Sequence, residues 1–123
     1  MDLWPTVAAL LNTETPKDLP GLNLTDEGAV AKRTRTFGED FTHNIADVNV
    51  PARSLQHRWV IDGWWKPIAP DPRNLPKAKA ELYDLRNDPE EKIDLAEKEP
   101  ERVTDLSRQL DAWWRPEPAP ATP

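Results

Sequence analysis

The sequence predicts an α+β domain: a small antiparallel sheet of three to four strands that contains a β-hairpin and is packed by a C-terminal helix. Two observations support this fold class. Strand-like segments flank Asp62-Gly63, which is typical of a two-residue hairpin loop because glycine accepts a positive φ. Residues 100–114 repeat apolar side chains at helical spacing. The sheet is therefore expected in the middle of the chain and its packing helix near the C-terminus.

The N-terminal residues 2–12 are predicted to form a short helix. Asp2 can cap it, and Pro5 falls in the first turn, where a missing N–H costs little. Apolar side chains recur on one face of this helix, namely Leu3, Val7, Leu10 and Leu11. Residues 13–33 contain prolines and glycines without a clear period, so we expect a connecting loop there.

The strands are expected within residues 35–50, 56–61, 64–68 and 80–85. The first of them carries β-compatible residues but is expected to be interrupted at Gly38. Pro67 lies in the second strand of the hairpin. Because proline cannot donate to a ladder, we expect that strand to lie at a sheet edge, to bulge there or to end early.

The C-terminal helix is expected to begin at Pro100, with acidic residues in its first turn. Its apolar stripe is formed by Val103, Leu106, Leu110 and either Trp113 or Trp114. Residues 115–123 are proline-rich and without an apolar period, so we expect a disordered tail.

The composition limits both stability and partners. The chain has 123 residues, of which 14 are proline, 37% are hydrophobic and none is cysteine, so a small core without disulfides is expected to need a partner surface. The net charge of -6 argues against a nucleic-acid partner, which requires clustered Lys and Arg. No window approaches the roughly 18 apolar residues of a transmembrane segment.

Glu39, Asp40 and His43 form the cluster with most chemical potential, since carboxylates and an imidazole can share a proton or bind a metal. A strand would place Glu39 and His43 on one face. A solvated strand end explains this cluster more simply than a catalytic or metal-binding role. The acidic residues at 87–101 lack the ligand pattern of a calcium loop, so we interpret them as turn and helix-cap residues.

Tryptophans around the hairpin allow two interpretations. Trp59, flanked by His57 and Arg58, could form a sugar platform, whereas packing of the hairpin's apolar face requires the same ring. We favour packing.

Several short motifs occur in an order that resembles the C-terminal region of a sulfatase of the arylsulfatase and N-sulfoglucosamine sulfohydrolase type. The match covers roughly residues 2–114, and its motifs are Asp2-Leu3-Trp4-Pro5-Thr6, Trp65-Lys66, Glu81-Leu82-Tyr83-Asp84-Leu85, Asn87-Asp88-Pro89-Glu90 and Asp94-Leu95-Ala96.

The resemblance implies an alkaline-phosphatase-like sulfatase C-terminal subdomain at 35–114, preceded at 1–34 by the end of a missing catalytic domain. That upstream domain of the same polypeptide would be the partner and would hold calcium and a formylglycine. This chain has no Cys and no Ser-x-Pro-x-Arg to supply the formylglycine, so no catalytic residue or cofactor is expected in it.

The implied role of the chain is to complete the fold of a sulfuric ester hydrolase and to wall its substrate pocket, with the chain inactive alone. Sulfated carbohydrate is the implied substrate. In that family the first strand of this region can lie near the pocket, which makes Glu39 and His43 our candidate substrate-binding residues. Arg58 or Lys66 could contact a sulfate group. The family resemblance suggests a periplasmic or extracellular location.

A self-standing carbohydrate-binding or adaptor module is the alternative. A carbohydrate-binding module predicts at least two exposed tryptophans in one line, and an adaptor predicts partner binding through residues 115–123. Neither explains the ordered motifs.

Overall fold

The chain divides into two units, Met1–Thr34 and Arg35–Pro123, in a computed structural model that describes residues 1–14, 16 and 21–116. Beyond Arg115 and Pro116, the tail predicted at 115–123 lies outside the described residues. Within the described part of the chain, no helix has the length and apolar content to cross a membrane.

The first unit contains the predicted N-terminal helix, α1 (Leu3–Leu10). Asp2 precedes it but makes no side-chain cap. Its carboxylate instead accepts hydrogen bonds from the Leu22 N–H at 3.0 Å and from both terminal nitrogens of Arg33 at 2.6 and 2.7 Å. The capping prediction was therefore wrong, because the carboxylate joins three distant segments. The Arg33 hydrogen bonds hold the pKa of Asp2 well below its usual range.

A second helix, α2 (Glu27–Lys32), lies within the segment predicted as a loop. Asp26 caps it by accepting a hydrogen bond from the Ala29 N–H at 3.0 Å. The helix has six residues and no buried side chain, so it carried no apolar period in the sequence.

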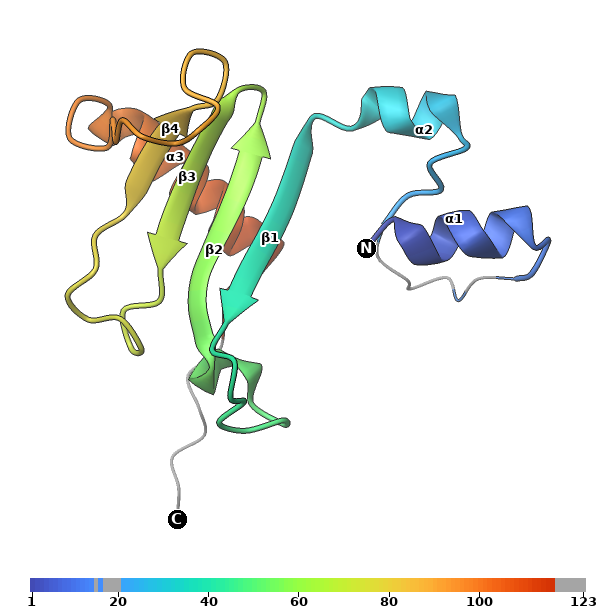
Figure 1. Ribbon diagram of the computed structural model, residues 1–123, viewed down its shortest axis with the longest axis horizontal. Helices are drawn as coiled ribbons and strands as arrows, with labels where there is room; N and C mark the ends of the chain where they lie inside the picture. Colours follow the sequence, from blue (N-terminus) through green and yellow to red (C-terminus); the bar gives the residue numbers. More distant parts are fainter. Residues whose placement is uncertain (15, 17–20, 117–123) are drawn as a thin grey trace. The chain divides into compact units, whose positions relative to one another are not determined.

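The second unit confirms the α+β prediction. Four antiparallel strands follow one another in the order β1-β2-β3-β4 (Figure 1). The elements are β1 (Arg35–Phe41), the 3₁₀ helix η1 (Pro51–Arg53), β2 (Leu55–Asp62), β3 (Trp65–Pro70), β4 (Glu81–Asp84) and α3 (Pro100–Trp113).

The hairpin between β2 and β3 is confirmed, with its loop one residue later than predicted. Asp62 pairs with Trp65, so the loop residues are Gly63 and Trp64. Gly63 has φ +61°, a conformation that glycine adopts without steric cost.

Gly38 does not interrupt β1, contrary to the sequence prediction. It pairs with Trp59, and the strand continues to Phe41. A Cβ at position 38 would lie 2.1 Å from the Cζ2 atom of Trp59. The glycine is thus required because the neighbouring indole lies directly over its backbone.

Pro67 lies in an inner strand, so the expected edge position was wrong. β3 has β2 on one side and β4 on the other. The pairs Trp59↔Ile68 and Asp62↔Trp65 keep the same register on both sides of Pro67, which pairs with Leu82 and is fully buried. The ladder tolerates one missing donor because buried packing holds the strand in place.

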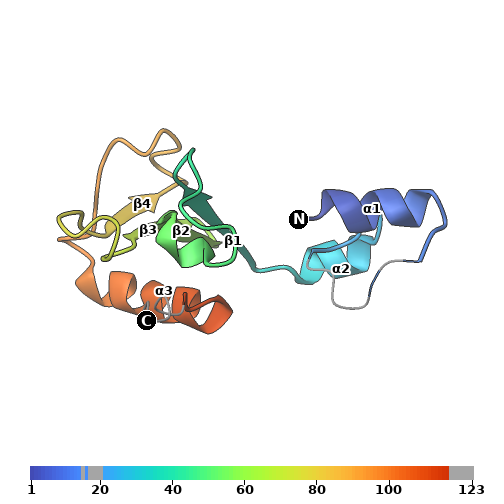
Figure 2. The ribbon, with the colours of Figure 1, turned by 90° about the horizontal axis from the view of Figure 1, so that it is seen from below.

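The core of this unit lies between α3 and one face of the sheet (Figure 2). Val60, Leu82, Leu106 and Leu110 are its buried members. Trp113, rather than Trp114, continues the helical stripe, packs against this cluster and stacks on Phe37 with ring centroids 5.0 Å apart.

Leu110→Ala is expected to lower the free energy of unfolding by about 2–5 kcal/mol, because a fully buried leucine leaves a cavity when it is truncated. Urea denaturation followed by tryptophan fluorescence measures the change. Arg108→Ala, on the exposed side of α3, serves as the control and should shift the midpoint little. Equal midpoints for wild type and Leu110→Ala would contradict the core assignment.

Gly38→Ala is expected to destabilise the second unit by about 1–3 kcal/mol, because the added methyl group overlaps the Trp59 ring. The same substitution in a Trp59→Ala background should cost much less. Gly28→Ala is the control: its Cβ would approach only Asp26 Oδ1, at 3.4 Å, and alanine favours the helix. Thermal unfolding of Gly38→Ala, Trp59→Ala, the double variant and the Gly28→Ala control tests this coupling. Additive effects at positions 38 and 59 would argue against it.

Candidate functional site

A cavity of about 500 Å³ lies where β1 ends. We call it the β1-end groove. Its lining residues are Phe41, Thr42, His43, Ile45, Asp47, Val48, Pro51 and Ser54. Phe41, Ile45 and Val48 are exposed large apolar side chains, so the groove presents a mainly apolar surface with a few polar groups.

Ser54 holds the two sides of the groove together. The pairing of β1 with β2 shifts by one residue between Asp40 and Phe41. Beyond this irregularity the Thr42 N–H donates to the Ser54 carbonyl at 2.8 Å, and the Ala46 N–H donates to Ser54 Oγ at 2.8 Å. Because Ser54 is buried, these bonds fix the loop that follows β1.

The charged side chain of the groove is neutralised locally. Asp47 accepts hydrogen bonds from Arg53 Nη1 and from the Asn49 N–H, each at 2.9 Å. Its carboxylate therefore shapes the loop rather than pointing a free charge into the groove.

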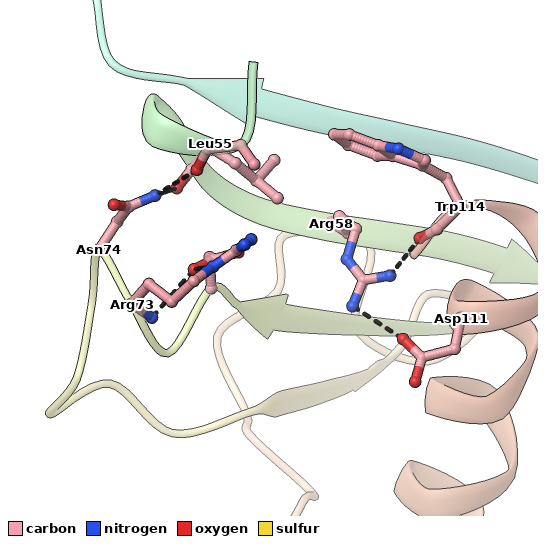
Figure 3. A network of polar contacts seen from close by, with 8 residues as sticks. Leu55, Arg58, Arg73, Asn74, Asp111 and Trp114 are labelled. Atoms are coloured by element: carbon pink, nitrogen blue, oxygen red, sulfur yellow. Dashed lines mark hydrogen bonds and ion pairs between the residues drawn. The ribbon is translucent and has the colours of Figure 1, made fainter. Parts of the chain in front are cut away.

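The loop between β3 and β4 braces η1 and the start of β2, and Figure 3 shows Asn74 of this loop bonded beside Leu55. Asn74 Nδ2 donates to the Ala52 carbonyl at 2.9 Å and to the Leu55 carbonyl at 2.7 Å. The buried Asp71 holds this loop, accepting from the Arg73 N–H and Nε at 2.9 Å each and from Nη2 at 2.5 Å. Burial raises the pKa of Asp71, but the Arg73 hydrogen bonds and charge outweigh it and leave that pKa below its usual value.

The two predicted substrate-binding residues lie in different surroundings. His43 is exposed and lines the β1-end groove. Glu39 is exposed on β1 opposite Arg58 and is not among the groove's lining residues. β1 ends at Phe41, so one regular strand does not carry both side chains.

The third member of the predicted cluster, Asp40, has a different imidazole as its partner. Its Oδ1 lies 3.0 Å from His57 Nδ1 across the β1–β2 pair. Within the described residues no group of three Asp, Glu or His side chains could hold a metal ion.

The two cations considered for sulfate have partners within the chain. Arg58 donates to the Trp114 carbonyl at 2.5 Å and to Asp111 Oδ1 at 3.0 Å, at the end of α3 (Figure 3). Lys66 Nζ donates to both Glu91 carboxylate oxygens, at 2.7 and 2.8 Å. Both side chains are more than four-fifths buried, so a structural role accounts for them.

Neither unit by itself presents a line of exposed tryptophans among its described residues. Trp59 is partly buried over Gly38, and the Lys66 ammonium lies 5.6 Å from its ring centroid. Trp4 and Trp64 are the exposed tryptophans, and they belong to different units. The packing interpretation of Trp59 is the one that these contacts favour.

Acidic side chains in the segment after β4 accept hydrogen bonds from nearby backbone N–H groups. Asp94 Oδ1 accepts from the Leu82 N–H at 3.0 Å and the Ala96 N–H at 2.9 Å, and Asp88 Oδ2 accepts from the Ile93 N–H at 2.8 Å. These contacts agree with turn chemistry rather than with a calcium loop.

Comparison with known proteins gives matches among solved structures. No family model matches the sequence, and no curated protein matches it. BT33336S-sulf, a protein of glycosaminoglycan metabolism in Bacteroides thetaiotaomicron, is 24% identical over 91% of this chain, with a TM-score of 0.59. The sulfatase candidate yidJ from Bacteroides fragilis is 19% identical over 91% of this chain, with a TM-score of 0.64.

A third similar structure is BT4656, solved with its substrate D-glucosamine-2-N,6-O-disulfate; it is 18% identical over 91% of this chain, with a TM-score of 0.62. The chain has the fold of a sulfatase C-terminal subdomain. It spans about a quarter of the length of the solved structures that it matches, 24% of BT33336S-sulf and 23% of the other two. The resemblance read from the ordered motifs is confirmed at the level of the fold.

Sequence reasoning missed the residues that brace the β1-end groove. Asp71 and Asn74 lie between the strands predicted at 64–68 and 80–85, in a segment where no site residue was predicted. The Asp71-Pro72-Arg73-Asn74 step does carry a turn signal, since aspartate before such a turn accepts backbone hydrogen bonds two residues on. The contact of Asn74 with η1 has no local signal, because it joins residues 19 and 22 positions apart.

Asp71→Asn is expected to lower stability by about 1–2 kcal/mol at neutral pH, because charge-assisted bonds to a partly exposed Arg73 are lost. Folding lowers the pKa of Asp71, so its carboxylate adds to the free energy of unfolding. This added stability is complete above the unfolded-state pKa of about 3.9 and disappears as the pH falls through the pKa of the folded state.

Urea unfolding measured from neutral to acidic pH should therefore show the difference between wild type and Asp71→Asn shrinking at low pH. Asp111→Asn is the control: this carboxylate is 45% exposed in its ion pair with Arg58, so its loss should have a smaller effect. A difference that stays constant with pH would contradict the assigned role of the Asp71 charge.

Proposed function

We propose that this chain is the C-terminal portion of a sulfatase, a sulfuric ester hydrolase that acts on sulfated carbohydrate, in which it completes the fold and walls one side of the substrate pocket. The observation that carries the proposal is the fold match over 91% of this chain with 23–24% of longer chains. The substrate of BT4656 is a sulfated glucosamine, which supports the choice of substrate class.

The chemistry of sulfate release is assigned to another part of the polypeptide. The sequence contains neither cysteine nor Ser-x-Pro-x-Arg, so it cannot supply the formylglycine that the family implies. The described residues likewise do not fit the implied calcium ion, since they contain no suitable group of three ligands. We therefore expect this chain to be inactive alone.

The β1-end groove is the part of this chain that we assign to the pocket wall. It combines apolar walls with the exposed imidazole of His43, an arrangement that can position a sugar ring and donate or accept one hydrogen bond. His43 is the stronger candidate for substrate contact. Glu39, which lies outside the groove, remains a proposed contact that needs a substrate extending along β1.

The test begins with the nucleic acid upstream of the Met1 codon, read in the same frame. We expect an open frame that contains Cys-x-Pro-x-Arg or Ser-x-Pro-x-Arg. The encoded longer polypeptide should release sulfate from D-glucosamine-2-N,6-O-disulfate or from an aryl sulfate, whereas this chain alone should not. An in-frame stop and a separate ribosome-binding signal would instead favour an independent small protein.

In the active longer polypeptide, His43→Ala should lower kcat/KM by about tenfold, the order expected for one lost substrate hydrogen bond. His57→Ala is the matched control, because this histidine contacts Asp40 rather than the groove. Unchanged kinetics for His43→Ala would remove the groove from the pocket wall while leaving the sulfatase proposal intact.

A further inference from the structure

The strand β1 lies at one edge of the four-stranded sheet, with β2 as its neighbour on one side (Figure 1). We propose that the other edge of β1 binds the same edge of a second copy of this chain, so that the two sheets join antiparallel about a twofold axis at Phe37. This surface is separate from the β1-end groove and does not depend on the sulfatase proposal.

The backbone direction of β1 follows from the ladder between β2 and β3. The Asp71 N–H donates to the Gln56 carbonyl at 2.7 Å, so the polar groups of Gln56 face β3. Because these groups alternate along a strand, the backbone N–H and C=O of Trp59 face β1. Gly38 pairs with Trp59, so the backbone N–H and C=O of Gly38 face β2. The residues of β1 whose backbone N–H and C=O face the free edge are therefore Arg35, Phe37 and Glu39.

Charge selects one register for the pairing of two such edges. With Phe37 opposite Phe37 of the second copy, Arg35 of each chain stands opposite Glu39 of the other. Two opposite-charge pairs then flank an aromatic pair on the same face of the joined sheet, and each of these cross-strand pairs is favourable. With Gly38 opposite Gly38, Glu39 would face Phe37 and Arg35 would face Phe41, so no charge would be matched.

The side chains that this register uses are accessible and held in place. Arg35 is 46% exposed and contacts Asp62 through Nε at 2.9 Å, which leaves its terminal nitrogens as donors. Glu39 is exposed. Phe37 is stacked on Trp113 with an angle of 15° between the rings, so little ordering is needed when a second strand approaches.

The features by which proteins usually prevent pairing at an edge strand do not oppose pairing at residues 35–39 of β1. Those features are prolines, charges and bulges. β1 contains no proline, and its irregularity between Asp40 and Phe41 comes after the five residues that would pair. Its charges are complementary in the antiparallel register rather than repulsive.

The small size of the contact limits the strength of this association. Pairing over five residues per chain buries a small area, so we expect a weak dimer that forms as concentration rises.

Charge reversal provides the test, with sedimentation velocity over a dilution series of the full chain. Arg35→Glu places Glu opposite Glu in both pairs of the homodimer, and Glu39→Arg places Arg opposite Arg. Each variant alone should dimerise roughly tenfold or more weakly than wild type. An equimolar mixture of the two variants should dimerise as wild type does, because both of its cross-strand pairs are again opposite in charge.

Asp40→Arg is the matched control: it makes the same charge change as Glu39→Arg on the neighbouring residue, whose side chain lies on the other face of the sheet. It should leave dimerisation near the wild-type level. Circular dichroism of each variant confirms that it is folded. A wild-type chain that stays monomeric at every concentration would overturn the proposal, and so would variants that are unaffected or a mixture that does not recover.

Discussion

The sheet of this protein depends on one apolar contact, between a single stripe of α3 and the middle of the strands β2 and β4. Val60 and Leu82 supply the strand side, and Leu106 and Leu110 supply the helix side. The chain has no cysteine, so no disulfide adds to this contact. Polar groups fix the helix near its two ends: the Arg102 guanidinium lies 4.1 Å from the Trp65 ring centroid, and Arg58 binds the Trp114 carbonyl. These two contacts fix the position of α3 along the sheet at both ends of a small core.

The β1-end groove is built differently from that core. Polar groups, rather than apolar side chains, determine its shape: the buried Ser54 joins its two sides, the half-buried Asn74 braces η1 from outside, and the buried Asp71 holds the loop that carries Asn74. Apolar side chains then remain on the surface of the loop instead of being consumed in its packing. A loop held by its backbone can change its exposed side chains without losing its course, which is the property expected of a variable recognition surface.

Elements with a local cause were predictable from the sequence, and those with a distant cause were not. The hairpin at Gly63 and the helix that begins at Pro100 were found because a turn residue and a helical period lie within a few positions. The strand that contains Pro67 was predicted at a sheet edge because proline lacks a backbone donor. That rule takes no account of the buried packing that holds β3 between two neighbours. Glu39 and His43 were grouped by an assumed regular strand, and the register irregularity that separates them depends on the pairing of β1 with β2. The motif order indicated the sulfatase-like fold when no local pattern could.

The two-residue hairpin also bears on how the chain acquires its structure. Joining β2 to β3 closes a loop of two residues, which costs little chain entropy and takes microseconds in isolated hairpins. The contact of Asp2 with Arg33 instead closes 31 positions, and packing α3 on Val60 closes more than 40, from Val60 to Leu106. We therefore expect the hairpin to form early in the folding of the second unit, which places Trp65 beside β2 before the helix that packs against it has docked.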